Sequence, residues 1–263
     1  MAWLLIDNSN SRTKLALGDA GGLLAWRSVI PTADLCAETL AAALGEIRFD
    51  AVACASVVPE KAAWLAEFFS GQPFHQITSR SPLGLSFGVP QPETMGADRL
   101  ANVVALKSKY GSPGIAIDFG TAVTFSVLSP EGIFIGGAIA PGMAAMTGYL
   151  ADRTAQLPLV DLSEPASPIG TTTAEAILSG AVIGHRGMVR EILRKIISAC
   201  GGQPKVVATG GGAEFGTKGI DEISTIDPDL TLEGVRLVAA LVFVSAGANR
   251  WKIEPQMDAD GRE

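Results

Sequence analysis

The chain has 263 residues, which allows one large domain or two small ones. Its 27 acidic and 20 basic residues give a net charge of −7, which argues against nucleic acid or an anionic membrane as a partner. Hydrophobic residues make up 48% and charged residues 18%, and this balance excludes a disordered chain. The three cysteines are widely spaced, and the first residues lack a basic segment. We therefore expect a cytoplasmic protein without disulfides, a zinc site or a signal peptide.

Apolar runs separated by turn residues predict strands and helices in the first half of the chain. Strands are predicted over residues 3–6, 13–17, 23–30, 51–58 and 74–78. A helical stretch is predicted over residues 31–47, and a second helix begins at Pro59, which suits a first helical turn. Residues 79–96 are rich in proline and are expected to form a loop, and a helix follows over residues 97–110.

The same order then restarts. A short strand over residues 115–117 leads to Asp118 and a turn, and further strands are predicted over residues 123–128 and 133–139. Helices are predicted to open at Pro141, to span residues 173–184 and 187–200, and to end the chain over residues 232–250. One more strand is predicted over residues 205–209, directly before three glycines.

This restart is an internal repeat. A shift of 111 residues places Asp7 on Asp118, Thr13 on Thr124 and Gly21 on Gly132. Such a repeat indicates two related domains, over residues 1–113 and 114–263, with the last helix able to pack back on the first domain. The alternative is a chance similarity between two β-meanders.

Each repeat ends a buried strand with an aspartate followed by small residues. Backbone N–H groups in such turns bind phosphate oxygens, and carboxylates hold Mg²⁺ that bridges to phosphate. Lys14, on the strand after the first turn, can reach phosphate as a point charge. The alternative for each turn alone is a plain hairpin with aspartate as the turn former. Two copies at matched positions favour the phosphate site.

Two further segments fit a phosphoryl-transfer cleft. Glycine clusters at residues 136–142 and 210–212 suit close approach of a nucleotide, or else only tight packing between elements. Asp98 and Arg99 lie at the start of a predicted helix, where they can form a cap and a surface ion pair. In a kinase cleft, Asp98 can instead accept a hydroxyl proton and Arg99 can bind a carboxylate. His75 and His185 have no partners at metal or nucleophile spacing, so we expect structural or surface roles for them.

Together these motifs resemble the type III pantothenate kinases, members of the acetate-kinase/sugar-kinase/Hsp70/actin superfamily, over nearly the whole chain. The family's opening D-x-G-N-[ST]-x-x-K is similar to residues 7–14, and its P-x-x-[LM]-G-x-D-R matches residues 92–99. The motifs D-x-G-T-A-x-T and G-G-x-I-x-P-G match residues 118–124 and 136–142. The remaining matches are T-x-x-A-I-x-x-G at 173–180, T-G-G at 209–211 and L-T-L-x-G at 230–234.

The resemblance implies an α/β fold of two ribonuclease-H-like (actin-like ATPase) domains, with mixed sheets flanked by helices and ATP in the cleft between them. The implied reaction is ATP-dependent phosphorylation of pantothenate to 4'-phosphopantothenate, the first step of coenzyme A biosynthesis. The implied cofactors are ATP, Mg²⁺ and a monovalent cation, either potassium or ammonium. A homodimer is also implied.

The resemblance assigns roles to individual residues. Asp98 is the implied general base, and Arg99 is implied to bind the pantothenate carboxylate. The pantothenate pocket would also include Gly96, Ala97, Val89 and, from the other subunit, Thr173. The implied contacts to ATP and its phosphates are Asp7, Asn8, Ser9, Asn10, Ser11, Arg12, Thr13, Lys14, Gly120, Thr121, Gly210 and Gly211. Asp7 and Asp118 would hold Mg²⁺, and Ser126 occupies the implied position for the monovalent cation.

Three residues depart from the family pattern. Ser9 replaces a glycine, Val89 replaces a tyrosine, and Ser126 replaces an aspartate. A serine restricts the backbone of the first phosphate turn more than glycine does. These departures leave two alternatives open. The chain can be a catalytically weak regulatory, nucleotide-binding paralogue, or a kinase for another hydroxy acid or sugar.

Overall fold

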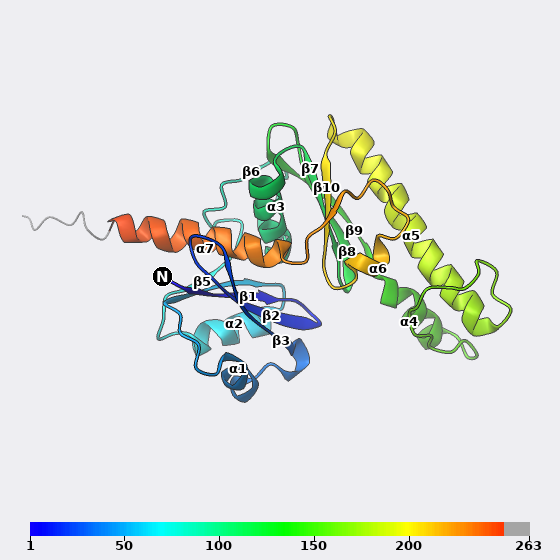
Figure 1. Ribbon diagram of the computed structural model, residues 1–263, viewed down its shortest axis with the longest axis horizontal. Helices are drawn as coiled ribbons and strands as arrows, with labels where there is room; N and C mark the ends of the chain where they lie inside the picture. Colours follow the sequence, from blue (N-terminus) through cyan, green and yellow to red (C-terminus); the bar gives the residue numbers. More distant parts are fainter. Residues whose placement is uncertain (250–263) are drawn as a thin grey trace, which may run out of the picture.

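Two mixed β-sheets organise the chain in the computed structural model, which describes residues 1–249 (Figure 1). The first sheet has the order β3-β2-β1-β4-β5. Its strands are β1 (Trp3–Asn8), β2 (Arg12–Gly18), β3 (Leu23–Pro31), β4 (Ala51–Ser56) and β5 (Phe74–Gln76). The second sheet has the order β11-β10-β7-β8-β9-β6. Its strands are β6 (Ser86–Phe87), β7 (Gly114–Phe119), β8 (Ala122–Leu128), β9 (Ile133–Pro141), β10 (Lys205–Thr209) and β11 (Thr225–Ile226).

The two sheets share one topology, as the internal repeat predicts. β1 pairs antiparallel with β2 and parallel with β4, and β7 pairs in the same way with β8 and β10. The aspartates occupy equivalent register positions, with Asp7 opposite Lys14 and Asp118 opposite Thr124. This common topology excludes a chance similarity and confirms the predicted class of mixed sheets flanked by helices.

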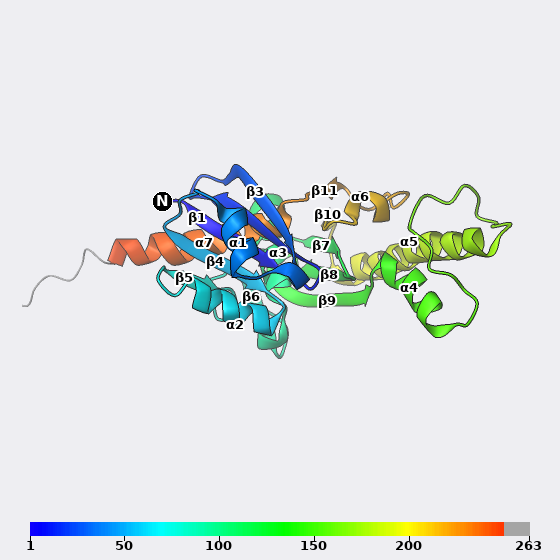
Figure 2. The same cartoon turned by 90° about the horizontal axis from the view of Figure 1, so that it is seen from below.

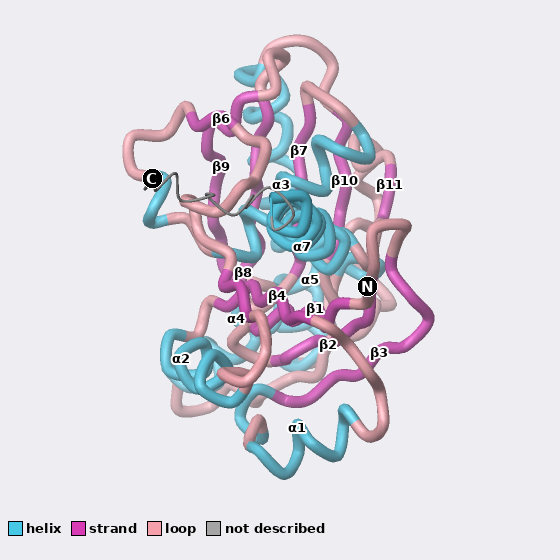
Figure 3. Tube along the Cα trace, turned by 90° about the vertical axis from the view of Figure 1, so that its left-hand side faces the viewer, coloured by secondary structure: helices cyan, strands magenta, loops and turns pink. Residues whose placement is uncertain are grey.

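The sheets are separated by a central layer of two helices, α3 (Ala97–Tyr110) and α7 (Leu230–Asn249). Figure 3 shows α7 nearly end-on, with the second sheet above it and the first sheet below. Leu100 of α3 and Val235 of α7 belong to the same buried apolar cluster as Trp3 and Val207, one from each sheet. The last helix therefore packs against β1 and β4 of the first sheet as well as against α3.

The outer faces of the sheets are covered by the remaining helices (Figure 2). On the first sheet these are α1 (Ala37–Leu44) and α2 (Pro59–Phe68), which bury Leu40 and Leu65. On the second sheet α5 (Thr173–Cys200) buries Val189 and Leu193. The helix α4 (Met143–Arg153) packs beside α5, and the short α6 (Ala213–Gly216) follows β10. Between residues 1 and 249, no helix is both long and apolar enough to span a membrane.

Several element boundaries differ from the sequence prediction. The predicted break between residues 184 and 187 is wrong, because α5 runs without interruption from Thr173 to Cys200. Glycine costs a helix roughly 1 kcal/mol but does not end it, and the buried face of α5 continues through this region. The predicted helix over residues 31–47 is a 3₁₀ turn, η1 (Thr32–Asp34), followed by α1.

The segment expected to be a loop also contains regular structure. Its residues include η2 (Pro92–Thr94) and β6, and β6 joins the second sheet at β9. The domain boundary at residue 113 stays a prediction, as does a second domain extending to residue 263. Residues 250–263 lie outside the described part.

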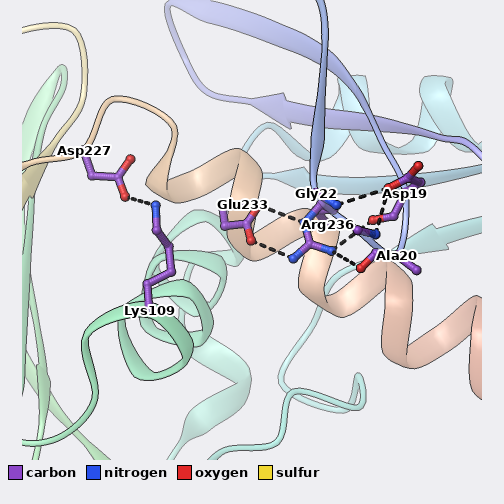
Figure 4. A network of polar contacts seen from close by, with 8 residues as sticks. Asp19, Ala20, Gly22, Lys109, Asp227, Glu233 and Arg236 are labelled. Atoms are coloured by element: carbon purple, nitrogen blue, oxygen red, sulfur yellow. Dashed lines mark hydrogen bonds and ion pairs between the residues drawn. The ribbon is translucent and has the colours of Figure 1, made fainter.

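Polar contacts hold the start of α7 against the first sheet and against α3 (Figure 4). Arg236 is 6% exposed, forms two hydrogen bonds with Glu233, and donates to the carbonyl of Asp19 in the β2–β3 turn. Before α7 begins, Asp227 forms an ion pair with Lys109 of α3. These contacts link the start of α7 to the first sheet and to α3.

In the central layer, the backbone of α7 at Gly234 lies close against the backbone of α3 at Ala101. A Cβ atom added there would lie 1.9 Å from the carbonyl oxygen of Ala101, so a side chain forces α7 away from α3. We predict that Gly234→Ala lowers the free energy of unfolding by about 1–3 kcal/mol in urea denaturation, as overpacked cores do. Gly187→Ala is the control, since nothing lies near its added Cβ, and it should be as stable as the wild type or more stable. If Gly234→Ala were as stable as the wild type, the close packing of α7 against α3 at this residue would be contradicted.

Candidate active site

A cavity of about 430 Å³ lies where the two aspartate turns face each other. It brings together segments from β1, β2, α3, β7, β8 and the turn after β10. Twelve of the residues to which the resemblance assigned a site role line it: Asp7, Ser9, Asn10, Ser11, Arg12, Lys14, Asp98, Asp118, Gly120, Thr121, Gly210 and Gly211. The pattern of strand-end aspartates therefore located a real cleft.

At the first turn, Asp7 lies one residue before the end of β1 and is 3% exposed. Burial raises the pKa of Asp7, and the Lys14 ammonium, with its Nζ 3.4 Å from Asp7 Oδ2, works against that rise. Ser9 donates from its hydroxyl to Asp7 Oδ1 at 3.2 Å. Within the described part of the chain, no residue other than glycine has a positive φ, so the turn accepts Ser9 without strain.

Asn8 and Thr13 were predicted to contact phosphate, but they do not line the cavity. They support the first turn through hydrogen bonds. Asn8 is buried, donates to Thr13 Oγ1 at 2.8 Å and accepts from Ser56 at 2.6 Å. Thr13 is buried as well and shares a 3.1 Å hydrogen bond with Thr32, which in turn donates to the carbonyl of Ser9. This chain of hydrogen bonds holds the first turn in shape.

In the second turn, Asp118 lies near the end of β7 and accepts a 3.3 Å hydrogen bond from Asn102 of α3. Asn102 accepts one from Thr231 of α7 at 2.8 Å, so the central helices position this carboxylate. Burial, and next the charge of Asp7, raise the pKa of Asp118 to about 6. Ser11 and Thr121 share a 2.9 Å hydrogen bond that links the two turns.

The wall beside Asp118 is formed by glycine. Gly210 has a φ of +90°, and a Cβ atom there would lie 2.3 Å from Asp118 Oδ1 and 2.7 Å from the carbonyl oxygen of Phe119. No side chain fits in that space. The backbone after β10 therefore comes directly against the carboxylate.

Asp98 lies in the first turn of α3 and points into the same cavity. Burial raises the pKa of its carboxyl, and the backbone N–H of Arg99, which donates to Asp98 Oδ1 at 2.7 Å, partly opposes this. The charge of Asp98 also raises the pKa of Asp7 and Asp118. Gly96, the N-cap of α3, and the buried Ala97 place Asp98 but do not line the cavity.

Arg99 is 8% exposed and lies behind the cavity, between α3 and β8. Its Nε donates to the Ser126 hydroxyl at 3.2 Å and its Nη2 to the carbonyl of Phe125 at 3.2 Å. Its Nη1 contacts the sulfur of Met95 at 3.6 Å. Burial lowers the pKa of this guanidinium. Because the Ser126 oxygen already faces a cation, these contacts do not fit a monovalent cation at Ser126.

The other two predicted substrate residues lie away from the cavity. Val89 follows β6 and approaches Gly136 of β9. Thr173 is the first residue of α5 and is exposed, next to a capping box formed by Thr172 and Glu175.

Among the cavity-wall residues that sequence reasoning missed are Leu162, His185 and Phe215. His185 is 1% exposed, in contrast to the surface position that was one of its two expected roles. These residues come from segments far apart in the chain, and no local motif contains them.

Two carboxylates of this cleft can act as metal ligands, Asp7 and Asp118. Across residues 1–249, no group of three or more His, Cys, Asp or Glu side chains is placed to hold a metal ion. A metal ion here would thus take its remaining ligands from water and phosphate, which is the usual coordination of Mg²⁺. The oxygen donors and their negative charge fit that ion.

Comparison with known proteins assigns the family. The model of the type III pantothenate kinase family matches residues 3–195. This chain belongs to that family. A type III pantothenate kinase from Akkermansia muciniphila is 46% identical over 92% of the chain and 99% of its own length. One from Methylacidiphilum infernorum is 42% identical over 91% of the chain and 89% of its own length.

A solved structure supports the actin-like fold of this family member. The activator of the 2-hydroxyisocaproyl-CoA dehydratase from Clostridium difficile, with bound ADPNP, superposes with a TM-score of 0.54. The two chains are 13% identical, and the match covers 97% of this chain and 98% of the other. The fold expected from the sequence is thus confirmed, and the family assignment makes the chain a kinase.

The raised pKa of Asp118 makes stability depend on pH. The folded chain holds this proton more tightly than a carboxyl at its ordinary value of 3.8, so its contribution to stability is full below pH 4 and is lost as pH rises through about 6. We predict that Asp118→Asn raises the free energy of unfolding at pH 8 by about 1–3 kcal/mol in metal-free buffer, and has no such effect at pH 4. The exposed Asp34→Asn is the control. An equal gain in the free energy of unfolding at pH 4 and at pH 8 would contradict the raised pKa of Asp118.

Proposed function

We propose that this chain transfers the γ-phosphate of ATP to pantothenate, giving 4'-phosphopantothenate, the first step of coenzyme A biosynthesis. One observation carries the proposal: Asp98 enters the cleft at the point where both strand-end carboxylates and Lys14 meet. A base thereby stands beside a site suited to phosphate. The family assignment identifies the acceptor.

The two turns would hold the triphosphate. Residues 9–12 and 120–121 line the cavity, where turn residues can contact phosphate oxygens, and Lys14 adds a positive charge. Asp7 and Asp118 would hold Mg²⁺, which supplies charge neutralisation for the phosphates. Phosphoryl transfer depends mainly on alignment and charge neutralisation, and this arrangement offers both.

Asp98 would orient the attacking hydroxyl of pantothenate and accept its proton. Its raised pKa suits this task, since a base is most effective when its pKa approaches the working pH. Arg99 would bind the pantothenate carboxylate through Nη1, because the Met95 thioether is a weak acceptor that a carboxylate can replace. Its other contacts, to Ser126 and Phe125, would hold the guanidinium in place.

The acceptor is tested by ADP release with pantothenate and a panel of other hydroxy acids and sugars, with and without potassium. We expect pantothenate to give the highest kcat/KM. ADP release only with another acceptor would show a kinase of different specificity. Nucleotide binding without ADP release for any acceptor would show a regulatory paralogue.

Asp98→Asn tests the general base. We predict that this variant loses about 10²- to 10⁴-fold in kcat, since a positioned base contributes about that much, while its thermal unfolding temperature is no lower than that of the wild type. Asp34→Asn is a matched control on an exposed turn and should keep full activity. Wild-type turnover by Asp98→Asn would mean that another group takes the proton.

We also propose a homodimer with Thr173 completing the pantothenate site of the other subunit. Thr173 lies outside its own cavity, and large apolar side chains are exposed nearby, including Tyr149 at 66%, Leu159 at 68% and Ile169 at 77%. An apolar surface of this kind is typical of an interface. We predict a dimer in sedimentation at assay concentrations. A monomer with full activity would contradict the shared site.

A further inference from the structure

Asn102 and Thr231 form a buried polar pair to which the proposed phosphoryl transfer gives no role. Asn102 is 1% exposed and lies on α3, and Thr231 is 2% exposed and lies in the first turn of α7. The residues on either side of each belong to the buried apolar cluster between the two sheets. Two apolar side chains of the same shape would be about as stable there, so the pair is expected to serve something other than stability.

The two hydrogen bonds of the Asn102 amide have a fixed order. Its Nδ2 donates to Asp118 Oδ2 at 3.3 Å, and its Oδ1 accepts from the Thr231 hydroxyl at 2.8 Å. An ionised carboxylate only accepts hydrogen bonds, whereas an amide has one donor end and one acceptor end. The Thr231 hydroxyl therefore keeps the donor end toward Asp118. Without it, nothing in this pair prevents the amide from turning its oxygen toward the carboxylate, which would repel it.

The packing of α7 on α3 brings the two groups together. Gly234 follows Thr231 by three residues, so both lie on the same face of α7. A Cβ atom added at Gly234 would lie 1.9 Å from the carbonyl oxygen of Ala101, the residue before Asn102. The ion pair that precedes α7, shown in Figure 4, also ties this end of the helix to α3. The close approach of the two helices thus places the hydroxyl within reach of the amide.

The Asp118 carboxylate is confined at both of its oxygens. Oδ2 accepts from Asn102, and Oδ1 lies against Gly210, where an added Cβ atom would be 2.3 Å away. Gly210 directly follows β10, which pairs with β7, the strand that carries Asp118. A ligand group that is already oriented loses less conformational freedom on binding, so this confinement favours a bound cation.

We propose that Thr231 and Asn102 are positioning residues for cation-dependent binding of the nucleotide. Thr231 orients the Asn102 amide, the amide holds Asp118, and Asp118 presents its carboxylate to the cation that accompanies ATP. Neither Thr231 nor Asn102 lines the cavity, so they act through Asp118 and not by touching the nucleotide. This relay is the reason for a polar chain inside the apolar central layer.

This inference rests on the proposed cation site at Asp118. The test contains no pantothenate, so its failure can be told from failure of the proposed kinase activity, which ADP release measures. ATP binding is measured by calorimetry under two conditions. One buffer contains Mg²⁺ and K⁺, and the other contains EDTA, with tetramethylammonium in place of both metal ions.

The variants separate the hydroxyl and the amide from their shapes. Thr231→Val removes the hydroxyl and keeps the branched side chain, and Thr231→Ser keeps the hydroxyl. Asn102→Leu removes the amide at similar size and gives a second variant of the same relay. Thr147→Val is the matched control, because Thr147 is 3% exposed and its hydroxyl donates to the carbonyl of Ala144 in its own helix, α4.

Thr231→Val and Asn102→Leu should each weaken ATP binding about three- to tenfold when the cations are present, the effect of losing one hydrogen bond. Without the cations, neither should change it. Thr231→Ser and Thr147→Val should bind ATP as the wild type does. Equal weakening of binding under both conditions would overturn the proposal, because it would assign the pair a purely structural role. Unchanged binding in Thr231→Val, or wild-type binding that does not depend on the cations, would overturn it as well.

The double variant of Thr231→Val and Asn102→Leu tests whether Thr231 acts through Asn102. Once the amide is gone, loss of the hydroxyl should have no further effect on cation-dependent binding, so the double variant should bind ATP like Asn102→Leu alone. Losses that add would show that the two residues act independently, and would overturn the relay.

Discussion

The structure depends on the burial of carboxylates of like charge in one cleft. Asp7 and Asp118 lie near the ends of equivalent strands of the two sheets, and Asp98 of α3 lines the same cavity. Burial raises the pKa of all three, and Asp98 raises the pKa of the other two further. Without a bound cation this arrangement is unfavourable, because burial and repulsion between like charges both raise the free energy of the charged carboxylates. It is favourable where a cation and a proton must be held, as phosphoryl transfer requires.

The rest of the fold holds these acids in place. The central layer of α3 and α7 carries Asp98 itself, and the hydrogen bonds from Thr231 to Asn102 to Asp118 connect that layer to the second sheet. The close approach at Gly234 keeps the two helices together, and Arg236 joins α7 to the β2–β3 turn. The helices α3 and α7, which form much of the hydrophobic core, therefore also position the three carboxylates.

The sequence predicted those parts of the site that arise locally. Asp7 and Asp118 could be found because each follows an apolar strand and precedes a turn, and the repeat doubled that signal. The same logic failed for His185, whose neighbours Phe119, Leu162 and Phe215 come from three distant segments. Local reasoning also could not show that Ser126 accepts a hydrogen bond from Arg99, or that α5 continues past its glycines. Packing partners decide such features, and one chain read residue by residue does not reveal them.

The proposed function requires that Asp7 and Asp118 form a site for a cation and its nucleotide. A cation that binds carboxylates stabilises their charged form, so binding must lower the pKa of Asp118 from about 6. Calorimetry of preformed Mg²⁺–ATP binding at pH 6, in two buffers with different ionisation enthalpies, measures the protons exchanged. We expect net proton release by the wild type and much less by Asp118→Asn. Binding without proton release, or with the same release in both proteins, would contradict it.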